Sequence, residues 1–121
     1  SILQADHINI SKNDRDAIIE AKRIIDSRLA FAPSCEELAK KVSISTSKLT
    51  KGFSSMFGTS VHAYVIDQRL EKAASLLLES NLNVSQVAIL VGYSKASNFA
   101  AAFKRKYGVN PKNYKAEVTI G

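Results

Sequence analysis

An internal repeat of about 50 residues constrains this chain of 121 residues more than any other feature of its sequence. The first matched set recurs at a spacing of 49 and pairs Leu38, Ala39, Val42 and Ser45 with Val87, Ala88, Val91 and Ser94. The second recurs at a spacing of 50 and pairs Leu49, Phe53, Phe57, Gly58 and Tyr64 with Phe99, Phe103, Tyr107, Gly108 and Tyr114. The second copy therefore gains one residue between the two matched sets, in or just after the turn that follows Val91. The repeat predicts two copies of one unit; a purely structural duplication is the alternative.

The stretch Ser45–Gly58 of the first copy is predicted to be a helix with two faces. Leu49, Phe53 and Phe57 recur every four residues and therefore share one side. The other side is hydroxylated and basic and contains no acid, with Thr46, Ser47, Thr50, Lys51 and Ser54. Ser45 suits the N-cap, and Gly58 stands where a helix ends. Such a helix can bury its aromatic rings and offer donors to an anion.

A short helix precedes this stretch and makes a helix-turn-helix with it. Ser34–Val42 begins with a capping box, in which Glu37 follows Ser34 by three residues. Only Ser43 and Ile44 separate it from the next helix, which is the arrangement of a helix-turn-helix. The second copy reads the same way, with Asn83 as cap, a helix over Val84–Val91, a turn at Gly92-Tyr93 and a second reading helix over Lys95–Tyr107.

The rest of the chain completes an all-α fold of seven helices, since no alternation typical of strands persists. We predict a first helix over Asn13–Phe31, with Ile18, Ala21, Ile25 and Leu29 facing inward, and a short final helix from Asn110 through about Ala116. A helix of about 18 residues within Ser60–Ser80, roughly 27 Å long, is expected to be a rigid connector. The expected organisation is an irregular segment 1–12, a first helix-turn-helix subdomain 13–59, the connector 60–80, and a second subdomain with the final helix 81–121.

The charge indicates a polyanionic partner. The net charge is +6, and no Asp or Glu lies between Ser80 and Ala116, where six Lys and Arg residues lie. A merely soluble cationic surface is the alternative.

With no apolar run of 18 residues and no signal peptide, we expect a cytoplasmic protein without a membrane partner. The single cysteine, Cys35, fits a reducing compartment. His7 and His62 are far apart and form no ligand cluster, and no catalytic set is present, so we expect no metal, no cofactor and no enzyme.

Both copies contain further motifs at fixed positions. The first copy contains Leu38-Ala39, Ser45, Leu49, Phe53, Phe57-Gly58, Tyr64, Arg69-Leu70-Glu71, Ala73 and Leu77-Leu78; the second contains Val87-Ala88, Val91-Gly92-Tyr93, Ser97, Phe99, Phe103-Lys104, Gly108-Val109, Pro111 and Tyr114. Over about Asp16 to Lys115, these motifs resemble the DNA-binding domain of AraC/XylS-type regulators. The resemblance implies seven helices in two helix-turn-helix subdomains joined by a long helix. It also implies a bacterial transcription regulator that works with RNA polymerase and whose sensing or dimerisation domain is absent from this chain. Lys48-Leu49, Gly52-Phe53 and Phe57–Val61 look closest to siderophore-responsive members.

The resemblance also implies positions for base reading, at Ser47, Thr50 and Lys51 and at Ala96, Ser97 and Ala101. An alanine offers only a methyl contact to thymine, so the second helix departs from relatives with Arg or Gln at the position of Ala101. Our candidates for base contacts are therefore Ser47, Thr50, Lys51, Lys95, Ser97 and Asn98. Candidates for phosphate contacts, which position without reading sequence, are Thr46, Ser54, Lys104 and Arg105. Lys51 could also be a solvated lysine or a phosphate contact.

Taken together, these features predict a sequence-specific domain for double-stranded DNA that reads two successive major grooves. The alternative is a helical module that binds an acidic protein. Arg69 is expected to form a structural salt bridge with Asp67 or Glu71 rather than to contact DNA.

Overall fold

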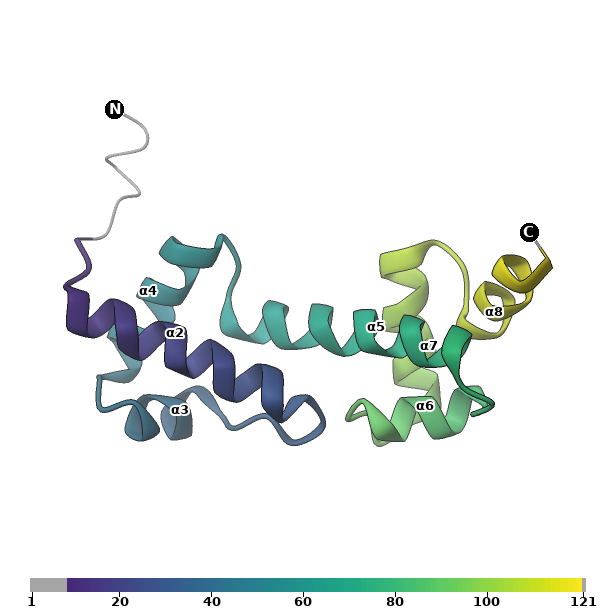
Figure 1. Cartoon of the computed structure of the whole chain (residues 1–121), viewed down its shortest axis with the longest axis horizontal. Helices are drawn as coiled ribbons and strands as arrows, with labels where there is room; N and C mark the ends of the chain where they lie inside the picture. Colours follow the sequence, from purple (N-terminus) through teal and green to yellow (C-terminus); the bar gives the residue numbers. More distant parts are fainter. Residues whose placement is uncertain (1–8, 121) are drawn as a thin grey trace, which may run out of the picture. The chain divides into compact units, whose positions relative to one another are not determined.

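The computed structural model describes residues 9–120 of the chain, with side chains described through Ala116, and all of its regular structure is helical (Figure 1). Seven α-helices and one 3-10 turn lie in these residues, as predicted for an all-α fold. They are α2 (Lys12–Ser27), the 3-10 turn η1 (Leu29–Phe31), α3 (Cys35–Lys41), α4 (Thr46–Phe57), α5 (Val61–Glu79), α6 (Val84–Leu90), α7 (Ala96–Tyr107) and α8 (Pro111–Ile120). Residues 1–8, which include His7 and most of the irregular segment predicted over 1–12, lie outside the described residues.

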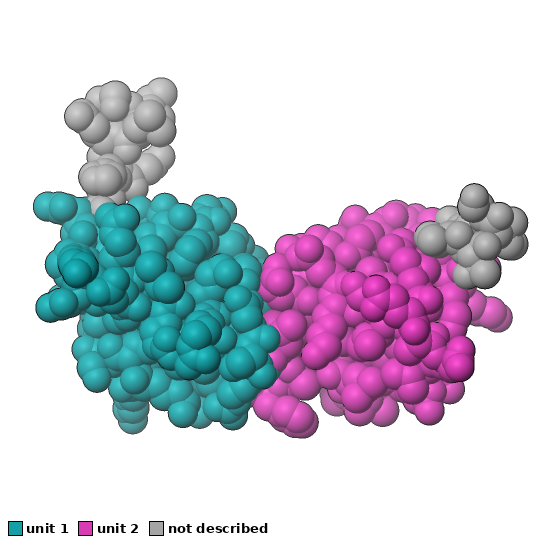
Figure 2. All heavy atoms as spheres, in the orientation of Figure 1, with its two compact units in different colours: residues 1–28, 32–65 teal, residues 29–31, 66–121 magenta. Residues whose placement is uncertain are grey.

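Packing divides the chain into two compact units, shown in teal and magenta in Figure 2. Unit 1 takes in the residues up to Arg28 together with Ala32–Val65, and unit 2 takes in Leu29–Phe31 together with the chain from Ile66. The helix α5 contributes residues to both. Each unit contains one helix-turn-helix, made by α3 and α4 in unit 1 and by α6 and α7 in unit 2.

The helix ends are set by local caps that the sequence predicted. Ser34 and Glu37 form the expected capping box at α3, and Asn83 forms one with Gln86 at α6. The Ser45 hydroxyl accepts from the backbone N–H of Lys48 at 3.1 Å and starts α4. Both reading helices end at a glycine in the left-handed region, Gly58 with φ 71° and Gly108 with φ 81°.

The two turns explain the extra residue in the second copy. The short helices α3 and α6 end at Val42 and Val91, 49 residues apart, whereas α4 and α7 are capped by Ser45 and Lys95, 50 residues apart. The added residue therefore lies in the second turn, as predicted. The pairing of Ser45 with Ser94 was wrong, however, because the residue that stands at the N-cap of α7 is Lys95.

Each unit has its own core, and the repeat extends to its aromatic rings. In unit 1 the buried Phe53 has Phe57 at 4.8 Å and Tyr64 at 5.6 Å between ring centroids. In unit 2 the buried Phe103 has Tyr107 at 4.6 Å and Tyr114 at 5.2 Å. The inward faces predicted for the helices are otherwise confirmed by burial of Ile18, Ala21, Ile25, Leu49, Leu70, Ala73, Leu77, Val87, Ala88, Val91 and Phe99. Leu29 and Phe57, also predicted to face inward, are only half-buried.

The first helix is shorter than predicted. It ends at Ser27 rather than Phe31, because Arg28 leaves the helical region with φ −140° and ψ 42°. The residues after it turn into η1, whose Leu29 carbonyl accepts a hydrogen bond from Arg69 Nε at 2.8 Å. This bond also corrects the expectation for Arg69, since the salt bridge predicted with Asp67 or Glu71 is replaced by a contact with backbone. The last helix, in contrast, continues beyond Ala116 to Ile120, in a stretch without Pro or Gly.

Candidate nucleic-acid interface

The outer face of α4 carries the predicted candidates of unit 1. Ser47, Lys51 and Ser54 are exposed, and Thr46 and Thr50 are half-buried. Leu49, Gly52 and Phe53 lie on the opposite side and are buried. Because the helical period places residues three and four apart on one side, this face is a continuous strip of hydroxyl groups with one lysine.

Hydrogen bonds and ion pairs leave Lys51 available on this strip. Among the residues that the structure describes, no carboxylate pairs with Lys51. Its neighbour Lys48 is held instead, with Nζ 3.4 Å from Asp14 Oδ2 of α2. The Thr50 hydroxyl donates to the Ser47 carbonyl at 3.3 Å, so it is left with its lone pairs as an acceptor.

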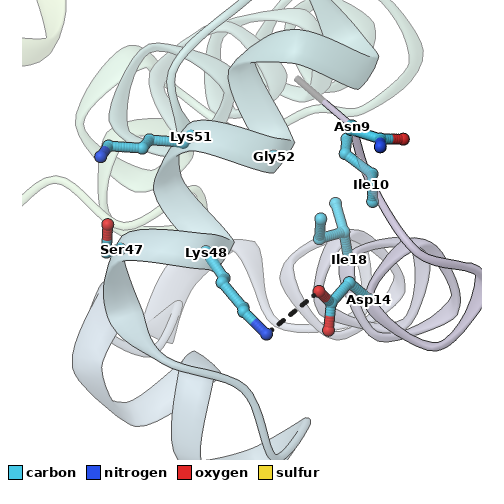
Figure 3. Close-up of a pocket in the computed structure, with 8 residues that line it drawn as sticks. All are labelled: Asn9, Ile10, Asp14, Ile18, Ser47, Lys48, Lys51 and Gly52. Atoms are coloured by element: carbon cyan, nitrogen blue, oxygen red, sulfur yellow. Dashed lines mark ion pairs between the residues drawn. The ribbon is translucent and has the colours of Figure 1, made fainter.

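A pocket of about 250 Å³ lies beside this strip, lined by Asn9, Ile10, Asp14, Ile18, Ser47, Lys48, Lys51 and Gly52. Figure 3 shows Lys48 reaching toward Asp14, while Ser47 and Lys51 project from the side of α4 away from Asp14. Gly52 allows the close approach of α2, since a Cβ there would lie 2.3 Å from Ile18 Cδ1. Sequence reasoning missed the pair of Lys48 and Asp14 because residues 34 positions apart share no periodic signal.

The outer face of α7 carries the candidates of unit 2. Ser97, Asn98, Lys104 and Arg105 are exposed, and the opposite Phe99 and Phe103 are fully buried. Lys95 is exposed at the N-cap, where its side chain makes no cap hydrogen bond. A lysine cannot accept a bond from the first N–H groups of the helix, so these donors are left to other partners.

The two outer faces share one register but differ in charge. With the offset of 50, the exposed Ser47, Lys51, Ser54 and Ser55 correspond to the exposed Ser97, Ala101, Lys104 and Arg105. The cation therefore lies in the first half of α4 and in the second half of α7, and neither helix contains an acid. Ser55 was not among the candidates, although the period of α4 places it beside Lys51. Lys106 belongs to another side of α7, because its Nζ pairs with Asp67 of α5.

Other kinds of site find no support in the part of the chain that the structure describes. The side chains described, those of residues 9–116, contain no group of three or more His, Cys, Asp and Glu that could hold a metal ion. Nor is any helix among them both long and apolar enough to span a bilayer. Burial, with a smaller contribution from Glu36, raises the pKa of the Cys35 thiol and so disfavours the reactive thiolate.

Comparisons with known proteins agree with this geometry. A family model described as a helix-turn-helix domain matches residues 38–117. The xylose operon regulatory protein of Escherichia coli K12 is 31% identical over 99 residues, which are 82% of this chain but only 25% of that protein. The chain thus spans about a quarter of the length of this relative.

Two solved structures have the same fold. The DNA-binding domain of the transcriptional factor AdpA, in complex with a target DNA, has a TM-score of 0.79 and 26% identity, over 84% of this chain and 91% of that one. An AraC-type transcriptional regulator from Chromobacterium violaceum also has a TM-score of 0.79, with 20% identity over 88% of this chain and 96% of that one.

Proposed function

The chain belongs to the helix-turn-helix family of AraC-type DNA-binding domains, which is not an enzyme family, and from this we propose that it binds a specific DNA duplex through the outer faces of α4 and α7. The observation that carries the proposal is the equivalence of these faces. In both units the second helix of a helix-turn-helix exposes a polar, acid-free strip in the same register. In such motifs this helix enters the major groove, and residues near its N-terminus contact base edges.

We assign base reading mainly to α4. Ser47 and Thr50 offer oxygen atoms, and Lys51 can donate to O6 and N7 of guanine. In α7 the corresponding Ala101 offers only a methyl group, so Ser97, Asn98 and Lys95 are the remaining candidates for base contacts. Lys104 and Arg105 are assigned to phosphates, together with Thr46 and Ser54 of α4, because these contacts position the protein without reading sequence.

Duplex affinity is expected to fall with salt. If each of the four cations Lys51, Lys95, Lys104 and Arg105 displaces about one counterion from the duplex, whether it contacts a base or a phosphate, the logarithm of affinity should decrease with that of salt concentration with a slope of about −3.6. Titrations by fluorescence anisotropy at several salt concentrations measure this slope. An affinity that does not change with salt concentration would contradict binding to a polyanion. If the salt dependence were lost in Lys104→Ala, Lys104 alone would account for it.

Lys51 and Lys104 are expected to contribute differently to DNA binding, the first to sequence preference and the second to affinity for any sequence. Lys51→Ala should remove about 1–3 kcal/mol of discrimination at one base position, because a base contact is lost. Lys104→Ala should weaken binding similarly for all sequences and reduce the salt slope by about one. The measurement is selection of bound duplexes from a random pool for each variant. Equal loss of preference in both variants would contradict this division of roles.

Lys95 is expected to reduce stability in favour of binding. Lys95→Ser supplies the missing cap of α7 and should raise the free energy of unfolding by about 1 kcal/mol, while duplex affinity falls because a cation near the groove is lost. Lys72→Ser is the matched control, since it removes an exposed lysine of α5 without creating a cap. Urea denaturation and anisotropy measure the two effects. If Lys95→Ser binds DNA as tightly as the parent chain, Lys95 does not contribute to the DNA interface.

The two units are proposed to occupy successive major grooves, with α5 as the connector. Because the two outer faces differ, one chain should then protect about 20 base pairs containing two unlike half-sites. If straight DNA does not allow both contacts, the duplex must bend or α7 must lie on the backbone. Footprinting of the monomer is the test of this arrangement. Protection of a single groove, or a palindromic site that requires two chains, would refute it.

We also propose a further domain, a cellular location and a protein partner for the regulator to which this chain belongs. The xylose operon regulatory protein is about four times as long as the segment that matches this chain, which supports a further sensing or dimerisation domain outside these 121 residues. A DNA-binding transcription regulator acts where bacterial DNA and RNA polymerase are, so we propose the cytoplasm as the location and RNA polymerase as a protein partner.

A further inference from the structure

Unit 2 exposes large apolar side chains that neither its core nor the outer face of α7 uses. Phe31 of η1 is 82% exposed, Ile89 of α6 is 68% exposed, and the adjacent Leu90 is 50% exposed. Phe31 and Ile89 border a pocket of about 210 Å³, whose other walls are Ala30, Gly92, Tyr93 and Ser94. We refer to these six lining residues as the Phe31 patch. Exposed apolar side chains gathered around a pocket are typical of a binding surface for a protein.

The Phe31 patch is held in place by contacts within unit 2. Arg69 Nε donates to the carbonyl of Leu29 at 2.8 Å and so fixes the start of η1. Gly92 lets the backbone of η1 approach the turn between α6 and α7, because a Cβ at Gly92 would lie 3.0 Å from both Cα and O of Ala30. Phe31 thus lies on a turn, η1, that a hydrogen bond and close packing hold in place. A surface that is already ordered loses little conformational entropy when a partner binds.

The surroundings of the Phe31 patch are positively charged. Burial raises the pKa of the Tyr93 hydroxyl, and the guanidinium groups of Arg69 and Arg105 lie close enough to oppose this shift. The exposed Lys95 follows Ser94 directly in the chain. No Asp or Glu occurs in residues 81–116, which include α6, the turn and α7. An apolar pocket with a basic border is complementary to apolar side chains flanked by carboxylates.

We propose that the Phe31 patch binds an acidic amphipathic segment of another protein, which places an apolar side chain in the pocket and its carboxylates toward Arg69, Arg105 and Lys95. An amphipathic helix presents anchors of this kind at positions i, i+3 or i+4. A second copy of the chain fits less well, because each copy has a net charge of +6. Phe31 and Ile89 have no donors for phosphate, so the lining of the pocket takes no part in the proposed DNA interface, whereas its basic border shares Lys95 and Arg105 with that interface.

Selection from a random library of displayed 16-residue peptides tests this surface, with the chain of 121 residues as target. The peptides that are enriched should carry Asp and Glu with apolar residues at helical spacing. Their affinity should fall at least tenfold for Phe31→Ser and for Ile89→Ser, and it should not change for the control Leu78→Ser, whose side chain is 42% exposed on α5 and does not line the pocket. Duplex affinity should be the same in all three variants, so a failure of DNA binding remains a separate result.

Three outcomes would overturn the proposal. Enriched peptides that lack acids, or that bind Phe31→Ser as tightly as the parent, would show that the patch does not select them. A loss of duplex affinity in Phe31→Ser or Ile89→Ser would assign the surface to DNA. A concentration-dependent dimer that disappears in Phe31→Ser would assign it to a second copy of the chain.

Discussion

Replacing Phe103 by alanine is expected to destabilise unit 2 by about 3–5 kcal/mol. The ring is fully buried and lies among three other aromatic rings, with centroid distances of 5.7 Å to Phe99, 4.6 Å to Tyr107 and 5.2 Å to Tyr114. Truncation removes the transfer free energy of the ring and leaves a cavity that the neighbouring rings fill only partly. A small domain is stable by only about 5–15 kcal/mol, so much of unit 2's stability would be lost. The equivalent Phe53→Ala should act similarly on unit 1.

Phe31→Ala is the matched control for Phe103→Ala, because Phe31 belongs to the same unit but is 82% exposed. Its effect on the free energy of unfolding should stay within about 0.5 kcal/mol. Urea denaturation followed by circular dichroism gives the overall change, and hydrogen exchange resolved along the chain assigns it to a unit. A soluble Phe103→Ala variant with an unchanged denaturation midpoint would mean that the inward face of α7 is wrongly assigned.

Replacing Gly92 by alanine is expected to cost roughly 3 kcal/mol or more, from two effects that add. Gly92 has φ +109°, a conformation that L residues rarely adopt and that costs on the order of 1–3 kcal/mol. The new Cβ would also lie 3.0 Å from Cα and O of Ala30, which are backbone atoms that cannot rotate away, and overpacking of this kind typically costs about 1–3 kcal/mol. Either η1 moves away from the turn or the turn itself distorts.

Gly108→Ala separates the two contributions to the cost at Gly92. Gly108 also has a positive φ, +81°, but a Cβ there meets nothing within 4 Å. This variant should therefore cost only the conformational part, about 1–2 kcal/mol. Chemical denaturation of both variants measures the difference. If Gly92→Ala were no more destabilising than Gly108→Ala, the close approach of Ala30 would not matter for the stability of unit 2.

Helix ends and buried faces were predictable because the chemistry that sets them is local. A cap such as Ser45 acts on an N–H group three residues away, and Gly58 and Gly108 each adopt a backbone conformation that suits glycine. The period of 3.6 residues likewise assigns Phe53 and Phe103 to the inside from their neighbours within one or two turns. The same period puts the five candidates of α4 on one polar face, whereas the candidates of α7 came from the resemblance to the family and from the basic charge of the second copy. The structure places all ten candidate residues for DNA contacts at exposed or half-buried positions of α4 and α7, including the N-cap Lys95. Their contacts with DNA stay predictions.

Contacts between residues far apart in the chain could not be predicted in this way. The sequence Leu29-Ala30-Phe31 has no helix breaker, yet α2 ends before it and η1 is held by Arg69, 40 residues away. For the same reason, the sequence did not predict that Lys48 pairs with Asp14 or that Phe31 is exposed beside Ile89, since these residues are far apart in the chain. The sequence by itself thus determined the helices, the N-caps of α3, α4 and α6, the two helix-turn-helix copies and the polar strips, because each depends on residues within a few turns. Only the tertiary structure decided that Lys48 pairs with Asp14 and Lys106 with Asp67, and where an apolar pocket opens, because both depend on which distant side chains packing brings together.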